Sequence, residues 1–148
     1  MKILVINGPN LQLLGNREVD IYGHLTLKNI ETNLIKTAKS IKNLELDFYQ
    51  SNHEGDIVDK IADAFYKQYD GIVINPAAYT HTSLAICDAI QAVRMPVVEV
   101  HISNIYKREE YRKHSYIAPA CIGQISGFGD KGYEYALIAL IDYINCNK

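Results

Sequence analysis

Short apolar segments alternate with amphipathic stretches along the whole chain. The apolar runs KILVIN at residues 2–7 and GIVIN at 71–75 are typical of strands that are covered on both faces. Three other short segments also predict strands. The predicted strands are 2–7, 44–50, 71–75, 97–101 and 119–123.

Between the predicted strands, apolar residues recur every three or four positions, which predicts helices with one buried side. Thr26 is the expected N-cap of the first helix, and Pro96 ends the third because proline disfavours a helical residue before it. A short helix is also expected in the charged segment 105–114. The positions that mark the other helices are Leu27, Ile30, Leu34, Ala38 and Ile41; Ile57, Val58, Ile61 and Phe65; residues 82–93; and Tyr133, Ala136, Leu137, Leu140, Ile141 and Ile144.

Repeated strand–helix units favour a parallel sheet with helices on both faces. Five strands in 148 residues fit the flavodoxin-like, doubly wound α/β fold, with strand order 2-1-3-4-5 and three α/β/α layers. The length is typical of one domain, so residues 1–148 are expected to form a single domain. Ligands of such sheets bind beyond the carboxyl ends of the strands, and these ends are therefore where chemistry is expected.

Composition narrows the range of partners. The formal net charge of -2 gives no basic field to attract nucleic acid, and no apolar run approaches the ~18 residues that a membrane helix needs. The three cysteines, Cys87, Cys121 and Cys146, are widely spaced and form no Cys-x-x-Cys pair. They are expected to be free thiols of a protein in a reducing compartment, the cytoplasm.

Polar residues cluster where three predicted strands end, and these clusters should open on one edge of the sheet. The clusters are residues 7–10 (NGPN), 75–82 (NPAAYTHT) and 99–104 (EVHISN). Taken singly, the asparagines fit turns and His81 fits a helix cap. Two histidines, His81 and His101, at adjacent strand ends favour a functional cleft. A metal site of His81, Glu99 and His101 stays open as an alternative, because Glu99 and His101 lie on the same side of one strand.

A long polar loop, residues 8–24, follows the first strand, and loops of this length often act as active-site lids. It carries Arg17 and Tyr22 at close spacing. In the charged segment further along, Arg108 and Arg112 lie one helical turn apart and together would present a fork to a carboxylate.

Glycine motifs for phosphate binding are missing from the sequence. No G-x-G-x-x-G follows the first strand and no G-x-x-x-x-G-K-[ST] occurs anywhere. A flavodoxin-like nucleotide-binding module is therefore the weaker alternative to an enzyme, and a metal-dependent hydrolase that uses His81 and His101 is a third hypothesis.

Several longer motifs occur together and in order. They are INGPNL at 6–11, LGNRE at 14–18 with Tyr22-Gly23, QSNHEG at 50–55, NPAAYTHTS at 75–83, EVHISN at 99–104 and GQISGFG at 123–129, with Glu109, Arg112 and Ser115 between the last two. On these motifs the chain resembles the type II 3-dehydroquinate dehydratases over essentially its whole length. One departure is Val19, which stands where that family usually has proline.

The resemblance implies a lyase that dehydrates 3-dehydroquinate to 3-dehydroshikimate in the shikimate pathway. It implies anti elimination through an enolate, with no metal, redox cofactor or Schiff base. The implied catalytic residues are Tyr22 as base, His101 as acid and Arg17 as a stabiliser of transition-state charge. The implied substrate-binding groups are Asn75, His81, Arg112, the main-chain amides of Ile102 and Ser103, and Asp88 from a neighbouring subunit. The implied supporting residues are Asn10, Arg108 and Glu99, which orients His101. The family's assembly implies a dodecamer built from trimers.

Overall fold

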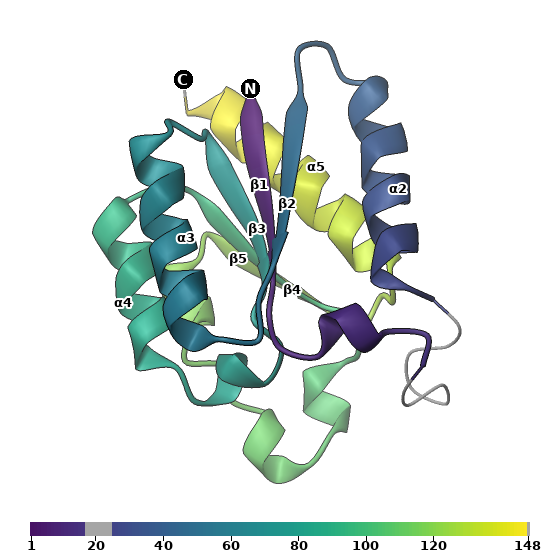
Figure 1. The fold of residues 1–148 in the computed structure, drawn as a ribbon, viewed down its shortest axis with the longest axis vertical. Helices are drawn as coiled ribbons and strands as arrows, with labels where there is room; N and C mark the ends of the chain where they lie inside the picture. Colours follow the sequence, from purple (N-terminus) through teal and green to yellow (C-terminus); the bar gives the residue numbers. More distant parts are fainter. Residues whose placement is uncertain (17–24, 148) are drawn as a thin grey trace.

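A computed structural model describes residues 1–16 and 25–147. Its centre is a parallel sheet in the order β2-β1-β3-β4-β5, which confirms the predicted flavodoxin-like arrangement (Figure 1). The strands are β1 (Lys2–Asn7), β2 (Glu45–Gln50), β3 (Gly71–Asn75), β4 (Val97–His101) and β5 (Gly123–Ser126).

Helices cover both faces of the sheet and complete three layers. The helices are α2 (Leu27–Lys39), α3 (Glu54–Tyr66), α4 (Leu84–Val93) and α5 (Lys131–Cys146). Figure 1 shows α2 and α5 on one face and α3 and α4 on the other. Strand β1 alternates accordingly: Ile3 and Val5 pack in the core under α2 and α5, whereas Leu4 and Ile6 pack in the core under α3 and α4.

Local sequence explains several helix ends. Thr26 caps α2 as predicted: its hydroxyl accepts a hydrogen bond from the Asn29 amide at 3.1 Å, and the Asn29 side chain accepts one from the Thr26 amide at 3.0 Å. The third helix begins later than predicted, at Leu84, because the hydroxyl of Ser83 accepts from the Ile86 amide and sets the start there. The chain before it, Ala77–His81, forms a 3-10 turn, η2.

Three sequence predictions were wrong in detail. The last strand is β5 and not 119–123, because Pro119 lacks the N–H that a ladder needs and lies in a 3-10 turn, η5 (Ala118–Ala120). The charged segment forms two 3-10 turns, η3 (Ile105–Lys107) and η4 (Glu110–Arg112), and not one helix. In α3 the buried residues are Ile57, Ile61 and Ala64, whereas Phe65, expected on the buried side, is exposed.

Register brings the carboxyl ends of the central strands together. Asn7 pairs with Asn75 across β1 and β3, and Ile74 pairs with Glu99 across β3 and β4. Alternation then directs Asn7 and Asn75 to the α2/α5 face, and Glu99 and His101 to the α3/α4 face. No helix in the described ranges is long and apolar enough to cross a membrane.

Candidate active site

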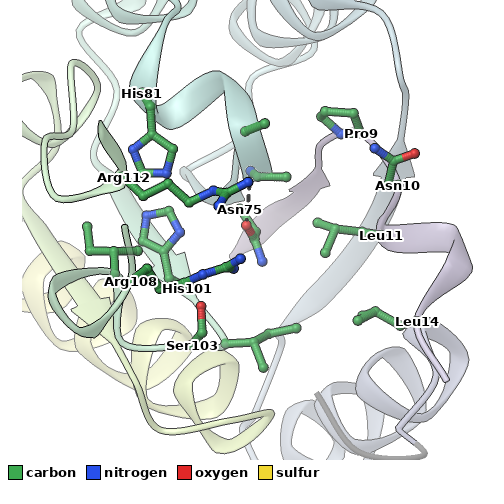
Figure 2. Close-up of a pocket in the computed structure, with 14 residues that line it drawn as sticks. Pro9, Asn10, Leu11, Leu14, Asn75, His81, His101, Ser103, Arg108 and Arg112 are labelled. Atoms are coloured by element: carbon green, nitrogen blue, oxygen red, sulfur yellow. Dashed lines mark hydrogen bonds between the residues drawn. The ribbon is translucent and has the colours of Figure 1, made fainter. Parts of the chain in front are cut away.

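A pocket opens at the carboxyl edge of the sheet, where the sequence predicted one (Figure 2). The loops after β1, β3 and β4 and the two 3-10 turns η3 and η4 supply its walls. Its lining residues are Pro9, Asn10, Leu11, Leu14, Asn75, Ala77, Ala78, His81, His101, Ile102, Ser103, Ile105, Arg108 and Arg112. The pocket thus combines an apolar floor with histidine, arginine and amide groups.

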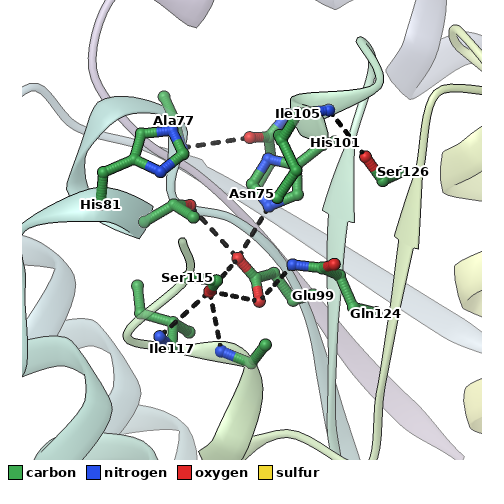
Figure 3. A network of polar contacts seen from close by, with 12 residues as sticks. Asn75, Ala77, His81, Glu99, His101, Ile105, Ser115, Ile117, Gln124 and Ser126 are labelled. Carbon is green, nitrogen blue, oxygen red and sulfur yellow. Dashed lines mark hydrogen bonds and ion pairs between the residues drawn. The ribbon is translucent and has the colours of Figure 1, made fainter. Parts of the chain in front are cut away.

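On one side of the pocket, His101 rests on a buried carboxylate (Figure 3). Its Nε2 lies 2.7 Å from Oε1 of Glu99, a residue with no exposed surface. Because a carboxylate only accepts, Nε2 carries the proton in this contact, which leaves Nδ1 for the pocket. This contact holds the imidazole ring in one orientation.

Three other side chains complete the surroundings of Glu99. The hydroxyl of Thr80 donates to Oε1 at 3.3 Å, and Nε2 of Gln124 donates to Oε2 at 3.1 Å. The Ser115 hydroxyl lies 3.0 Å from both carboxylate oxygens and accepts from the amides of Ile117 and Ala118. We call Glu99 and its partners Thr80, His101, Ser115 and Gln124 the carboxylate cage.

On the other side of the pocket, Asn75 belongs to a neutral buried network. Its Nδ2 donates to the hydroxyl of Tyr133 at 2.8 Å, and that hydroxyl donates to Oδ1 of Asn7 at 2.6 Å. Oδ1 of Asn75 accepts from the Ala77 amide at 3.1 Å. We call Asn7, Asn75 and Tyr133 the amide bridge.

His81 lines the same pocket as Asn75 and is held by the main chain. Its Nδ1 lies 2.8 Å from the carbonyl oxygen of His114, so Nδ1 donates and Nε2 is left as an acceptor in the neutral ring. Burial lowers the pKa of His81 below its ordinary value, and this effect outweighs the hydrogen bond to the His114 carbonyl, which raises the pKa. The environment therefore favours the neutral ring.

The arginines share one carboxylate. Nη1 of Arg112 lies 2.5 Å from Glu109, and Nε of Arg108 lies 3.6 Å from the same side chain. The hydrogen bond from Arg112 lowers the pKa of Glu109 to about 2, so this carboxylate stays ionised. Figure 2 shows both guanidinium groups extending toward Asn75. Arg108 directly follows η3 and Arg112 ends η4, so the two arginines do not share one helix. Their predicted role as a fork for a substrate carboxylate stays a prediction.

Close backbone contacts shape the mouth of the pocket. Gly8 donates to the carbonyl of Asn75 at 2.8 Å, and a Cβ there would meet the carbonyl oxygen of Pro76 at 2.4 Å. Asn10 and Ala77, both in the pocket wall, have positive φ angles of 66° and 52°. Non-glycine residues in this region are strained, and such strain concentrates at functional sites.

Known proteins resemble this chain in sequence over nearly its whole length. The model of the family described as "Dehydroquinase class II" matches residues 1–141. This chain belongs to that family. A protein named 3-dehydroquinate dehydratase from Caldicellulosiruptor saccharolyticus is 61% identical over 139 residues, which cover 94% of this chain and 95% of that protein.

Solved structures agree with the family assignment. The type II dehydroquinase from Butyrivibrio crossotus matches with a TM-score of 0.92 at 53% identity, over 95% of this chain and 97% of that one. The type II dehydroquinase from Propionibacterium acnes matches with a TM-score of 0.87 at 40% identity, over 97% of this chain and 96% of that one.

In this chain, most of the predicted site residues that the structure describes meet in one pocket. The exceptions among described residues are Glu99, which lies behind His101, and Asp88, which is exposed on α4 and does not line the pocket. Arg17 and Tyr22 lie outside the described residues.

Sequence reasoning missed the residues that support the site from behind. Thr80, Gln124 and Tyr133 were not singled out as site residues, yet each bonds directly to a predicted one. The register of β4 and β5 places Gln124 beside Glu99, and the packing of α5 on the sheet places the Tyr133 hydroxyl beside Asn75.

The metal hypothesis lacks geometric support in the part of the chain that the structure describes. Residues 1–16 and 25–147 contain no group of three or more histidine, cysteine, aspartate or glutamate side chains placed to hold a metal ion. Glu99, the acidic member of the hypothetical set, instead accepts from the donors of the carboxylate cage.

Proposed function

We propose that this protein dehydrates 3-dehydroquinate to 3-dehydroshikimate, the activity named for its relatives. The observation that carries the proposal is the family match over residues 1–141, joined to a pocket in which a histidine rests on a buried carboxylate. The ketone of the substrate makes the proton on the neighbouring carbon acidic. The elimination then needs a base to remove this proton, an acid to protonate the leaving hydroxyl, and hydrogen-bond donors for the enolate oxygen.

His101 is the proposed acid that protonates the departing C1 hydroxyl. Its Nδ1 is the ring nitrogen that Glu99 leaves for the pocket. The imidazolium that delivers the proton is stabilised by the adjacent carboxylate, which also fixes the ring. A histidine suits this step because imidazole titrates near neutral pH.

Tyr22 is the proposed base that removes the C2 proton. A tyrosine has a reference pKa of about 10, so only about one in a thousand is ionised at pH 7. Nearby cations lower such a pKa by roughly 1 to 3. Arg17 on the same loop is proposed to supply one cation, and Arg108 or Arg112 in the pocket wall is proposed to supply another.

The remaining pocket groups are proposed to hold the substrate. The main-chain amides of Ile102 and Ser103 would bind its carboxylate, and the Nε2 acceptor of His81 would bind a hydroxyl together with Arg112. Asn75 would hold the enolate oxygen, directly or through a water. Asn10 would support this end of the pocket, since its amide N–H is tied to Asn52 at 2.9 Å.

We also propose that the enzyme acts as a single catalytic domain of the shikimate pathway in the cytoplasm, where its three free cysteines stay reduced. We propose a dodecamer built from trimers, in which Asp88 reaches a neighbouring subunit's site. This accords with the exposed position of Asp88 outside its own pocket. Asp88→Ala should then weaken substrate affinity or assembly, measured by KM and by light scattering; no change in either would contradict the shared site.

The deciding experiment adds 3-dehydroquinate to chelator-treated protein and follows the ultraviolet absorbance of the conjugated enone product. Tyr22→Phe should lose roughly 10²–10⁴ in kcat. Tyr66→Phe is the matched control, because Tyr66 is 80% exposed on α3 and lies outside the pocket. No turnover by folded wild-type protein would overturn the proposed function. Retention of more than about a tenth of kcat in Tyr22→Phe would overturn the base assignment alone.

A further inference from the structure

The amide bridge joins two strands and one helix at the edge of the pocket. Asn7 and Asn75 are register partners on β1 and β3, so their side chains lie next to each other on one face. Tyr133 reaches them from α5, and its ring is fully buried. Asn7 and Asn75 are 1% and 3% exposed. Only Asn75 lines the pocket.

The directions of the hydrogen bonds in the bridge follow from the backbone amide of Ala77. The Ala77 amide can only donate, so the atom of Asn75 that faces it must be Oδ1. Nδ2 of Asn75 then faces the Tyr133 hydroxyl and donates to it, which leaves the phenol proton to Oδ1 of Asn7. If the Asn75 amide were flipped, its NH₂ group would face the N–H of Ala77, which is also a donor. The carbonyl oxygens of Asn75 and Asn7 would then compete for the single proton of the Tyr133 hydroxyl.

The phenol is a permanent donor over the working pH range. Burial raises the pKa of Tyr133 far above its ordinary value, so the hydroxyl keeps its proton. The bridge therefore holds one hydrogen-bond polarity and does not titrate with the acid and base.

We propose that Tyr133 is a positioning residue that acts through Asn75. It engages one of the two Nδ2 protons of Asn75 and so directs the second into the pocket as a fixed donor for a developing enolate oxygen, or for the water that holds it. This inference rests on the proposed function. It explains why a neutral buried tyrosine lies behind a pocket residue, with both of its hydrogen-bonding roles in use.

A donor aimed at charge that develops during the reaction changes kcat more than KM. Asn75→Ala should therefore lower kcat by roughly 10²-fold, the effect of losing one donor to an oxyanion. Tyr133→Phe keeps the buried ring but frees the amide, and it should lower kcat by about 10-fold with KM changed by less than about threefold.

A double-mutant cycle tests whether Tyr133 acts through Asn75. If it does, Asn75→Ala with Tyr133→Phe should be no slower than Asn75→Ala alone, within about twofold. Losses that multiply would overturn the inference, as would a wild-type kcat in Tyr133→Phe.

Two further variants separate positioning from folding. Tyr69→Phe is the matched control, because Tyr69 is also buried and donates its hydroxyl proton to a side chain, Asp47, but lies outside the pocket. It should lose stability and keep kcat. Asn7→Ala removes the acceptor of the phenol proton without touching ring or pocket, and should lower kcat by roughly two- to fivefold. If Tyr133→Phe does not fold, an unchanged kcat in Asn7→Ala overturns the inference.

The same assay distinguishes this inference from the function on which it rests. Absence of turnover by the wild-type enzyme would overturn both. Normal wild-type turnover, with additive losses in the cycle, would overturn the positioning role and leave the dehydratase proposal standing.

Discussion

The carboxylate cage and the amide bridge lie on opposite faces of the sheet and reach the same pocket, and they differ in charge. The cage surrounds one fully buried carboxylate with four side chains, whereas the bridge joins two amides and a phenol with no formal charge. In the proposed reaction, charge changes on His101, next to the cage, while Asn75 keeps its protonation throughout. In this protein the buried charge therefore lies next to the group that is proposed to gain and lose a proton. The neutral amide bridge is sufficient for Asn75, because only the orientation of its amide must be held.

The two networks also differ in what their loss should cost. Breaking a buried ion pair by removing one partner typically destabilises a protein by about 3–5 kcal/mol, whereas leaving a neutral buried donor unpaired costs about 1–3 kcal/mol. Variants of the cage should therefore alter both folding and chemistry, and variants of the bridge mainly the orientation of one donor.

The largest effect is expected at the point where the cage meets the pocket. His101→Ala should lower kcat by roughly 10²–10⁴-fold and leave KM nearly unchanged, because the lost group acts in the transition state. Steady-state kinetics on 3-dehydroquinate give both constants. His53→Ala serves as a control, since His53 lies outside the pocket at the start of α3. A His101→Ala enzyme with wild-type kcat would end the acid assignment.

Removing the charge but keeping the shape tests the cage itself. Glu99→Gln should lower kcat by roughly 10–100-fold, because a neutral amide stabilises an imidazolium less than a carboxylate does. It should also cost about 1–3 kcal/mol in urea unfolding. The hydroxyl of Ser115 accepts from two backbone amides and must donate to residue 99, so the new NH₂ group meets a donor.

Asp47→Asn is the control for Glu99→Gln. Asp47 also binds a tyrosine hydroxyl and a lysine, but it lies on β2 away from the pocket. It should leave kcat unchanged. Equal kcat in wild type and Glu99→Gln would show that the charge of the cage is not needed, and the contrast between the two networks would then be one of geometry alone.

The amide bridge requires the carboxyl ends of β1 and β3 to lie close together. Gly8 allows this close contact, because it has no Cβ to meet the backbone of Pro76. Gly8→Ala would place a Cβ 2.4 Å from the carbonyl oxygen of Pro76, a backbone atom that a rotamer change cannot move. We expect a loss of about 1–3 kcal/mol in stability and roughly a 10-fold fall in kcat from displacement of Asn75. Gly55→Ala in α3 is the matched control, because a Cβ there meets nothing within 4 Å. It should be neutral or slightly stabilising. Similar thermal unfolding of the two variants would contradict this account.

The sequence predicted the strand order and the pocket better than it predicted the residues that hold the pocket from behind, such as Gln124 and Tyr133. Apolar runs such as 2–7 and 71–75 determine strands directly, and parallel topology then places Asn75 and His101 at one edge. The apolar neighbours of Pro119 predict a strand, but Pro119 has no N–H to donate to a neighbouring strand and lies in the 3-10 turn η5. Tyr133 was correctly expected on the apolar side of the last helix.

The pattern of apolar and polar residues did not indicate a function for the buried hydroxyl of Tyr133. A tyrosine among leucines looks like core, and its role appears only when the register of β1 and β3 sets two amides beneath it. Ser115 and Gln124 are similar cases, because their partner Glu99 lies 16 and 25 positions away in sequence. Side-chain networks between distant segments depend on tertiary packing, which local periodicity does not encode.

The smallest effect is expected at the exposed rim, where Glu109 pairs with the two pocket arginines. Its side chain is 48% exposed, so solvent screens the ion pairs. Glu109→Gln should raise KM by roughly two- to fivefold with little change in kcat, since the arginines stay charged but are held less firmly. Glu110→Gln is the control, because Glu110 lies in the same segment, is 88% exposed and pairs only with Lys113 in the described contacts.

The pH dependence of KM separates this rim from the buried networks. Arg112 lowers the pKa of Glu109 to about 2, so the stabilisation from the pair is complete above the ordinary value of 4.5 and is lost only as pH falls through about 2. The ratio of KM in Glu109→Gln to KM in wild type should therefore be the same at pH 5.5 and pH 8. A ratio that returned to one at pH 5.5 would mean that Glu109 had already lost its charge there, and that the arginines are positioned by other contacts.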